Sequence, residues 1–130
     1  MEILLALLIE WLAVNANLKI ESPPTVIIET ASVLNEKYER PVHALYEDEE
    51  QTIYLSDSID LNTHHGASVL LHELVHHYQQ ESGAMEQFAC IRESEELAYK
   101  IQRQYLESNK IELLPELDPF NIYMRSMCSG

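Results

Sequence analysis

The sequence is poor in basic residues, in glycine and in cysteine, and each shortage excludes a class of protein. Eight Lys and Arg stand against 22 Asp and Glu, which gives a formal net charge of −14. Nucleic acids and anionic membrane surfaces are bound through basic patches, so neither is expected as the main partner. Three Gly and five Pro exclude a collagen-like or low-complexity chain. Two Cys are too few for a disulfide scaffold or a four-cysteine zinc site.

The sequence also has little that points to a membrane. The apolar run Ile3–Ile9 is far shorter than the roughly 20 residues that a spanning helix needs. No Lys or Arg precedes this run, and Glu2 and Glu10 bracket it, which argues against a signal peptide. Small and polar residues recur every three or four positions, which predicts an amphipathic helix over residues 2–17. Neither a membrane span nor a signal peptide is therefore expected.

The length and the pattern of the chain indicate one small domain of mixed structure. A chain of 130 residues with 46% apolar residues suits a single domain over residues 1–130. Two apolar runs, 42–46 and 52–55, flank an acidic connection and predict a hairpin. The fold class is expected to be α+β, a small sheet with this hairpin packed against helices. The other expected elements are a strand at 25–28, helices at 31–39, 65–80 and 85–108, and an extended segment over the last 20 residues.

The most informative segment is His72-Glu73-Leu74-Val75-His76, inside the expected helix 65–80. Residues four apart on a helix differ by about 40° around its axis, so His72 and His76 face the same way. Their imidazoles suit one Zn²⁺ at about 2.0–2.1 Å. Glu73 lies about 100° further round, where its carboxylate can take a proton from a metal-bound water. The pattern predicts a zinc site with a general base; the alternative is a helix with ordinary core or surface histidines.

A catalytic zinc ion usually has a third protein ligand, and the candidates are glutamates after the motif. The Gly and third His of metzincins are missing, since Gln79 and Ser82 stand at those positions. On a helix over 85–108, Glu95 lies at the centre of the apolar stripe, where an unpaired carboxylate is unfavourable. Glu95 is therefore the predicted ligand; a core hydrogen bond or a pair with Arg92 is the alternative. Glu96 is expected near the edge of the apolar stripe, Glu86 a little beyond it, and Glu93 on the solvent side of the helix.

The motif and the residues that follow it resemble a known family. The segment His72–His76, followed 19 residues later by Glu95-Glu96-Leu97-Ala98-Tyr99, resembles the gluzincin metallopeptidases, thermolysin-like zincins with two His from one helix and a Glu from the next. The resemblance covers about residues 65–106, and this stretch is similar to uncharacterised small bacterial proteins of that type. It implies a minimal, single-domain zincin-like fold with two adjacent metal-binding helices. The implied zinc ligands and base are His72, His76, Glu95 and Glu73.

The resemblance also implies a reaction. Zinc-dependent hydrolysis of a peptide bond is expected, with Glu73 passing the proton of the water to the leaving nitrogen. A strand near residues 52–56 would border the cleft and pair with an extended peptide or protein substrate. Tyr99 stands where many family members have an Asp that orients a ligand His, so its hydroxyl would do the same, steady an oxyanion, or pack in the core. The alternatives are a zinc-binding protein without turnover and a non-metal interaction module.

The remaining histidines and the cysteines are not assigned to this chemistry. His77 points about 100° away from His76 and is expected at the surface or beside the ligands. Cys90 and Cys128 either form a disulfide, which implies a periplasmic or exported protein, or stay reduced, as in the cytoplasm. The sequence therefore leaves the compartment open. His64 and His65 precede the expected helix and are expected in a loop or at the mouth of the site. His43 is expected on a strand, with no partner evident.

Overall fold

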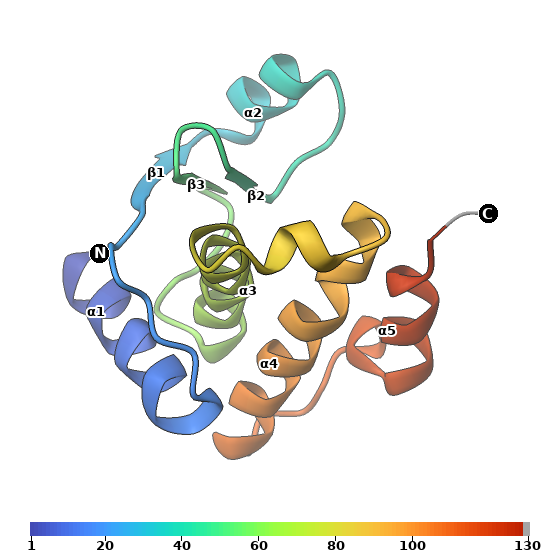
Figure 1. Cartoon of the computed structure of the whole chain (residues 1–130). Coiled ribbons are helices and arrows are strands. Elements are labelled where there is room, and N and C mark those ends of the chain that lie inside the picture. The colour runs from blue at the N-terminus through green and yellow to red at the C-terminus, as the bar shows by residue number, and fades with distance from the viewer. Residues whose placement is uncertain (129–130) are drawn as a thin grey trace.

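The structure, a computed structural model, describes residues 1–128 and has one three-stranded sheet and five α-helices within them (Figure 1). The mixed α+β class expected from the sequence is confirmed. Among the described residues, no helix combines the length and the apolar character needed to cross a membrane. The strands are β1 (Thr25–Glu29), β2 (Ala44–Glu47) and β3 (Thr52–Ser56). The helices are α1 (Glu2–Trp11), α2 (Ala31–Tyr38), α3 (His64–Glu81), α4 (Ser94–Ser108) and α5 (Pro119–Ser126).

The sheet has the strand order β1-β3-β2, so the last strand in the sequence lies in the middle. β3 pairs in parallel with β1 and antiparallel with β2, which confirms the predicted hairpin. All five residues of β3 are buried. The expectation that residues 52–56 border the cleft is wrong, because both edges of this strand are paired. The edge strand on that side of the sheet is β2.

Alternate residues of the strands face two layers, as the period of two requires. One face joins the main core with α1, α3 and α4, through Val26, Ala44, Tyr46, Ile53 and Leu55. On the other face, Leu34 of α2 packs with Val42 and Tyr54 in a smaller cluster. The sheet is therefore covered by helices on both faces, with α2 on one face and the larger core on the other (Figure 1).

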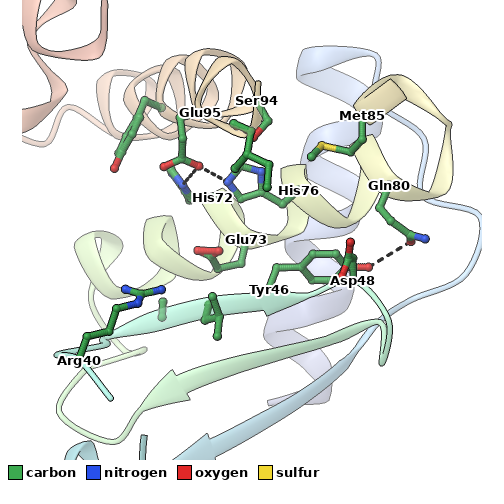
Figure 2. Close-up of a pocket in the computed structure, with 14 residues that line it drawn as sticks. Arg40, Tyr46, Asp48, His72, Glu73, His76, Gln80, Met85, Ser94 and Glu95 are labelled. Carbon is green, nitrogen blue, oxygen red and sulfur yellow. Dashed lines mark hydrogen bonds and ion pairs between the residues drawn. The ribbon is translucent and has the colours of Figure 1, made fainter. Parts of the chain in front are cut away.

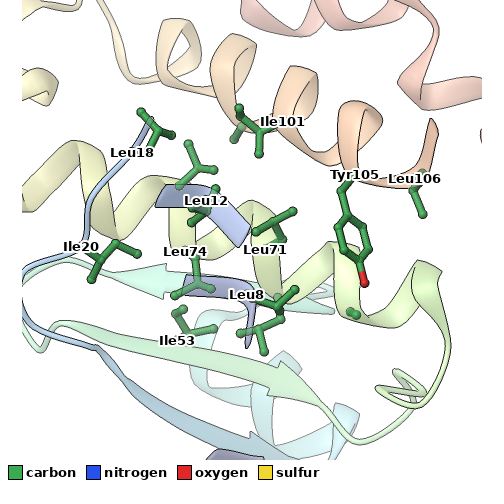
Figure 3. Packing of buried hydrophobic residues seen from close by; sticks show 14 of the residues in the cluster. Leu8, Leu12, Leu18, Ile20, Ile53, Leu71, Leu74, Ile101, Tyr105 and Leu106 are labelled. Carbon is green, nitrogen blue, oxygen red and sulfur yellow. The ribbon is translucent and has the colours of Figure 1, made fainter. Parts of the chain in front are cut away.

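Helix α3 lies at the centre of the molecule and carries the His-Glu-x-x-His motif. The Thr63 side chain caps its start by accepting a hydrogen bond from the backbone N–H of Gly66. A Cβ at Gly66 would lie 1.9 Å from the carbonyl oxygen of Asp60, so only glycine fits under this loop. Leu71 and Leu74 have no exposed surface and contact the core residues of α1 and α4 (Figure 3). Burial of this leucine face fixes which way the rest of the helix points.

The N-terminal helix is confirmed, and its last turn is unusual. α1 continues as a π-helical turn, Leu12–Ala16, and Asn17 ends it in the left-handed conformation with φ 56°. Leu8 and Leu12 are buried against the core. The small and polar stripe seen in the sequence faces solvent, as an amphipathic helix requires.

The expected helix over 85–108 is wrong in its first third. The chain there forms two short 3₁₀ turns, Ala84–Gln87 and Ile91–Glu93, and α4 starts only at Ser94. Cys90 is extended, and it is bonded to Cys128. On a helical wheel of residues 85–108, Ile91 would lie about 40° from Glu95, near the apolar stripe, but it is 77% exposed. The wheel failed because these residues do not belong to the same helix as Glu95.

The C-terminal segment is also more ordered than expected. Pro115–Leu117 forms a 3₁₀ turn, and α5 follows in place of the extended segment expected there. Pro119 occupies the first turn of α5, where its missing N–H is harmless, and the Asp118 side chain caps the helix. α5 packs on α4 and is held to the segment before α4 by the Cys90–Cys128 disulfide. Residues 129–130 lie outside the described part of the chain.

Candidate metal centre

A pocket of about 510 Å³ lies between the edge strand β2 and the helices α3 and α4 (Figure 2). The predicted ligands and base all line it, together with residues of β2. The segment between α3 and α4 contributes further walls through Met85 and Ile91. The sequence-predicted site residues that meet in this pocket are His72, Glu73, His76, Glu95 and Tyr99.

The three predicted ligands converge on one point. His72 and His76 lie one turn apart on α3, with ring centroids 5.0 Å apart. Glu95, the second residue of α4, reaches across to them. Its Oε1 lies 3.3 Å from Nε2 of His72 and also contacts Nε2 of His76. Two imidazole nitrogens and a carboxylate oxygen thus share one small volume.

Glu73 lies in the same pocket but on a different side of the histidines. Figure 2 shows its carboxylate on the β2 side of the two rings, whereas Glu95 approaches from α4. His72, Glu73 and His76 each offer a ligand atom within 4.8 Å of the others. Glu73 is buried despite its charge. Its position beside the histidines is the one expected for a base that does not itself bond to the metal.

Two glutamines hold the far sides of the imidazoles, and the sequence interpretation missed both. Nδ1 of His76 lies 2.9 Å from Oε1 of Gln79, three residues further along α3. Nδ1 of His72 lies 3.0 Å from Oε1 of Gln102 on α4. The spacing offered a signal for each: Gln79 is one turn after His76, and Gln102 is two turns after Glu95 on the same helix face.

The ionisable groups of the site shift the pKa values of one another. Burial alone would lower the pKa of His76, but the hydrogen bond to Glu95 and the charges of Glu73 and Glu95 raise this pKa to about 9. Burial would raise the pKa of Glu95, but hydrogen bonds from His72 and His76 hold it well below its usual range. A partly buried carboxylate therefore lies between two imidazoles, and its negative charge favours a cation at this point. This arrangement of charge also suits a bound divalent cation.

Tyr99 lies against the site without bonding to a ligand. Its ring packs edge-on to the ring of His72, with centroids 4.5 Å apart. Its hydroxyl accepts a hydrogen bond of 3.2 Å from Nη1 of Arg125 on α5. Burial, and secondly the charge of Glu95, raise the pKa of Tyr99. Of the three roles expected, the hydrogen bond to a ligand histidine is not formed among the described residues, and the packing contact is.

His77 is not at the surface, so that alternative is wrong. It has no exposed surface, and its Nδ1 lies 2.8 Å from the hydroxyl of Tyr46 on β2. Its Nε2 lies 2.6 Å from the carbonyl oxygen of Ser22. The imidazole thus joins α3 to the edge strand and to the segment before β1. His77 is buried because the sheet packs against this side of α3, and a helical wheel of α3 alone contains no information about the sheet.

The other candidates lie elsewhere. Arg92 donates hydrogen bonds to the carbonyl oxygens of Met124 and Arg125 and does not pair with Glu95. Glu96 is exposed and pairs with Lys100 at 2.6 Å. His43 and Glu86 are exposed, and Glu93 lies in the 3₁₀ turn before α4. None of the three lines the pocket. At the start of α3, His64 lies 3.3 Å from the hydroxyl of Tyr105, and neither His64 nor His65 lines the pocket.

Comparison with known proteins places the whole chain in one family. The family described as Domain of unknown function (DUF6647) matches residues 1–130, so the chain belongs to it. No curated protein and no solved structure matches the chain. The chemistry of the pocket must therefore be inferred from its own residues.

Proposed function

We propose that this family member is a zinc-dependent hydrolase, a minimal zincin-like metallopeptidase that cleaves peptide bonds with Glu73 as general base. The observation that carries the proposal is the convergence of His72, His76 and Glu95 in a pocket that also holds a second carboxylate. Two histidines and one carboxylate are a known ligand set of catalytic zinc, which keeps a fourth position open. The resemblance to gluzincins points to the same residues.

The donor atoms fit zinc in number and chemistry, and one pair of them also fits it in spacing. Two atoms bound to one tetrahedral zinc at about 2.0–2.1 Å lie roughly 3.3 Å apart. The separation of His72 Nε2 and Glu95 Oε1 is 3.3 Å, and His76 Nε2 contacts the same oxygen. His72, His76 and Glu95 would therefore hold the ion. Bound there, zinc supplies a Lewis acid for the scissile carbonyl and for a water molecule.

Glu73 is the residue best positioned to move a proton. Glu73 is 7% exposed, and one of its carboxylate oxygens lies within 4.8 Å of the imidazole ligand atoms. In the proposed reaction it takes the proton of the attacking water and delivers that proton to the leaving nitrogen. A group with this role contributes about 10²–10⁴-fold to the rate.

The edge strand β2 supports a peptide as the substrate. The N–H of Ser56 donates to the carbonyl of His43 at 2.7 Å, so in an antiparallel pair the next bonded residues are Leu45 and Glu47. The backbone groups of Ala44 and Tyr46 then point away from β3, where no further strand pairs with them among the described residues. β2 lines the pocket, so an extended peptide can add to it as a strand.

The charges around β2 suit a peptide as well. Arg40 precedes this strand and Asp48 follows it, and both line the pocket. Figure 2 shows them on either side of the site. A peptide lying along β2 would therefore meet a cation at one end and a carboxylate at the other. Ionic groups of opposite sign on the substrate would gain partners at both ends.

The test combines zinc analysis with a peptide library read by mass spectrometry. Wild type should hold about one zinc per chain and cleave responsive peptides. Glu73→Gln should keep the zinc and lower cleavage by about 10²–10⁴-fold, because only the base is lost. Glu96→Gln is the matched control, since Glu96 is exposed and paired with Lys100. It should change neither quantity.

The other outcomes point to different functions. Zinc binding without cleavage of any library peptide would indicate a zinc-binding protein without turnover. Absence of zinc after incubation with it would reject the metal centre and leave an interaction module. Unchanged cleavage by Glu73→Gln would show that another group is the base.

A further inference from the structure

In both histidines, the ring nitrogen that does not face Glu95 is hydrogen-bonded to a side chain. Each Nδ1 faces the amide of a glutamine, and both glutamines are buried, with 1% exposure for Gln79 and 9% for Gln102. A glutamine amide can present either its oxygen or its NH₂ group, and the two choices have opposite meanings for the imidazole. The partners at the other end of each amide decide between them.

The orientation of Gln79 is fixed by a backbone carbonyl. Its Nε2 lies 3.0 Å from the carbonyl oxygen of Ser94. A carbonyl oxygen only accepts hydrogen bonds, so the NH₂ group must be at this end. The oxygen of Gln79 therefore faces Nδ1 of His76 at 2.9 Å, and that nitrogen must be the donor.

The orientation of Gln102 is fixed through one more step. The hydroxyl of Ser68 donates its single proton to the carbonyl oxygen of His65 at 2.6 Å. Ser68 Oγ can then only accept from Gln102 Nε2, which lies 3.1 Å away. The oxygen of Gln102 faces Nδ1 of His72 at 3.0 Å, so this nitrogen also carries a proton.

We infer that Gln79 and Gln102 are positioning residues that keep the proton of each imidazole on Nδ1 and direct both Nε2 lone pairs to the metal. This inference rests on the proposed zinc centre. A neutral histidine binds metal through one nitrogen, and the hydrogen bond of the other nitrogen selects which. Here two backbone carbonyls, those of Ser94 and His65, set both choices through neutral side chains.

Gln79 has a second consequence for the site. The carbonyl that anchors it belongs to Ser94, the residue directly before Glu95. One amide thus orients a ligand of α3 and fixes the backbone beside the ligand of α4. Gln79 is therefore expected to affect the metal more than Gln102, whose anchor lies back on α3 at Ser68.

The experiment compares Gln79→Leu and Gln102→Leu with Gln104→Leu. Gln104 is exposed on α4 and its side chain donates a hydrogen bond to the carbonyl of Asn15, away from the pocket, so it is the matched control. Zinc affinity is measured by competition with a chelator, and thermal melting reports folding. The first two variants should bind zinc about 10–100-fold more weakly, and the control should match wild type. Gln102→Glu keeps an acceptor at Nδ1 and should restore binding.

A spectroscopic readout separates positioning from simple stability. Long-range ¹H–¹⁵N spectra of zinc-loaded wild type should show the metal on Nε2 and the proton on Nδ1 of His72 and His76. Coordination through Nδ1, wild-type affinity in both leucine variants, or binding by Gln102→Glu as weak as by Gln102→Leu would overturn the inference.

Failure of the zinc centre itself would look different. If wild type binds no zinc, the proposed function fails, and the same spectra are recorded on the Glu95→Ala variant at pH 10, because this change removes the carboxylate that faces both Nε2 atoms. The neutral imidazoles of this variant should carry their protons on Nδ1, and adding Gln79→Leu or Gln102→Leu should redistribute them. Protons on Nε2 in Glu95→Ala would overturn the inference independently of zinc.

Discussion

The two helices that meet at the site hold their ligands by different means. α3 runs unbroken from His64 to Glu81, is capped by Thr63, and buries its leucines in the core, so its two histidines are positioned by their own helix. Glu95 is the second residue of α4, whose start has no side-chain cap. The residues before it are two 3₁₀ turns joined by an extended stretch.

Contacts from distant parts of the chain compensate for this weak local structure. Gln79 bonds to the carbonyl of Ser94, Arg92 bonds to carbonyls of α5, and Cys90 is bonded to Cys128. The comparison teaches that half of this site is encoded within one helix, whereas the other half depends on tertiary contacts. The predictions below test that division.

The largest effect is expected from removing a ligand on either helix. His72→Ala and Glu95→Ala should each lose nearly all zinc, because a third protein ligand is required for tight binding. Metal content per chain measures this, with Glu96→Ala as the exposed control. Zinc retained by Glu95→Ala but lost by His72→Ala would give the ligand role to Glu73, which lies within reach of both histidines.

Removing the disulfide should affect the α4 side of the site. The bond closes a loop with a sequence separation of 38, so replacing Cys90 and Cys128 with Ala should lower the free energy of unfolding by about 2–4 kcal/mol. Urea unfolding of the oxidised wild type and the double variant measures the difference. Zinc affinity should fall as well, because the chain before Glu95 is less constrained. An unchanged unfolding midpoint would show that the other contacts suffice.

The pair of His76 on α3 and Glu95 on α4 should give the zinc-free chain a defined pH optimum. The raised pKa of His76 means that its contribution to stability is complete below 6.5 and is lost as the pH rises through about 9. The lowered pKa of Glu95 means that its contribution is present above 4.5 and is lost at lower pH.

Melting temperatures in EDTA should therefore peak between pH 4.5 and 6.5, and His76→Ala should remove the decline toward pH 9. Zinc binding at neutral pH should release a proton from this pair, which calorimetry in two buffers detects. A wild-type stability that is flat from pH 5 to 9 would contradict the coupling.

The smallest effect is expected at the local cap of α3. Thr63→Ala removes the acceptor for the N–H of Gly66 and should lower the free energy of unfolding by about 1 kcal/mol. Zinc affinity should stay at the wild-type value, because the cap lies more than two turns before His72. Chemical denaturation and chelator competition measure the two quantities. A large loss of zinc affinity would mean that the histidines also depend on the surroundings of α3.

Local periodicity correctly predicted the elements in which a regular set of side chains faces the core. The helix that carries the histidines, the hairpin and the N-terminal helix follow from patterns of period 3.6 or 2. Glu95 could be chosen because Ala98 and Leu106, which lie within about 60° of it around the axis of α4, are buried. The same wheel extended this helix too far back, since Ile91 lies in another element.

The features that the sequence did not predict are set by distant partners. The extended conformation of Cys90 accompanies its bond to a residue 38 positions away. The burial of His77 depends on Tyr46 and Ser22, and the role of Gln102 depends on Ser68 in another helix. The central position of β3 depends on its parallel pairing with β1. None of these contacts repeats with a local period.

The Cys90–Cys128 bond also divides the molecule into a linear part and a covalent ring. The two histidines belong to the linear part, whereas Glu95, α4 and α5 lie within the ring. A protease that cuts once inside the ring, for example after the exposed Lys110, would leave both fragments joined. The nicked protein would keep every ligand on one covalent molecule, so exposure of this loop to proteolysis does not by itself separate the two halves of the site.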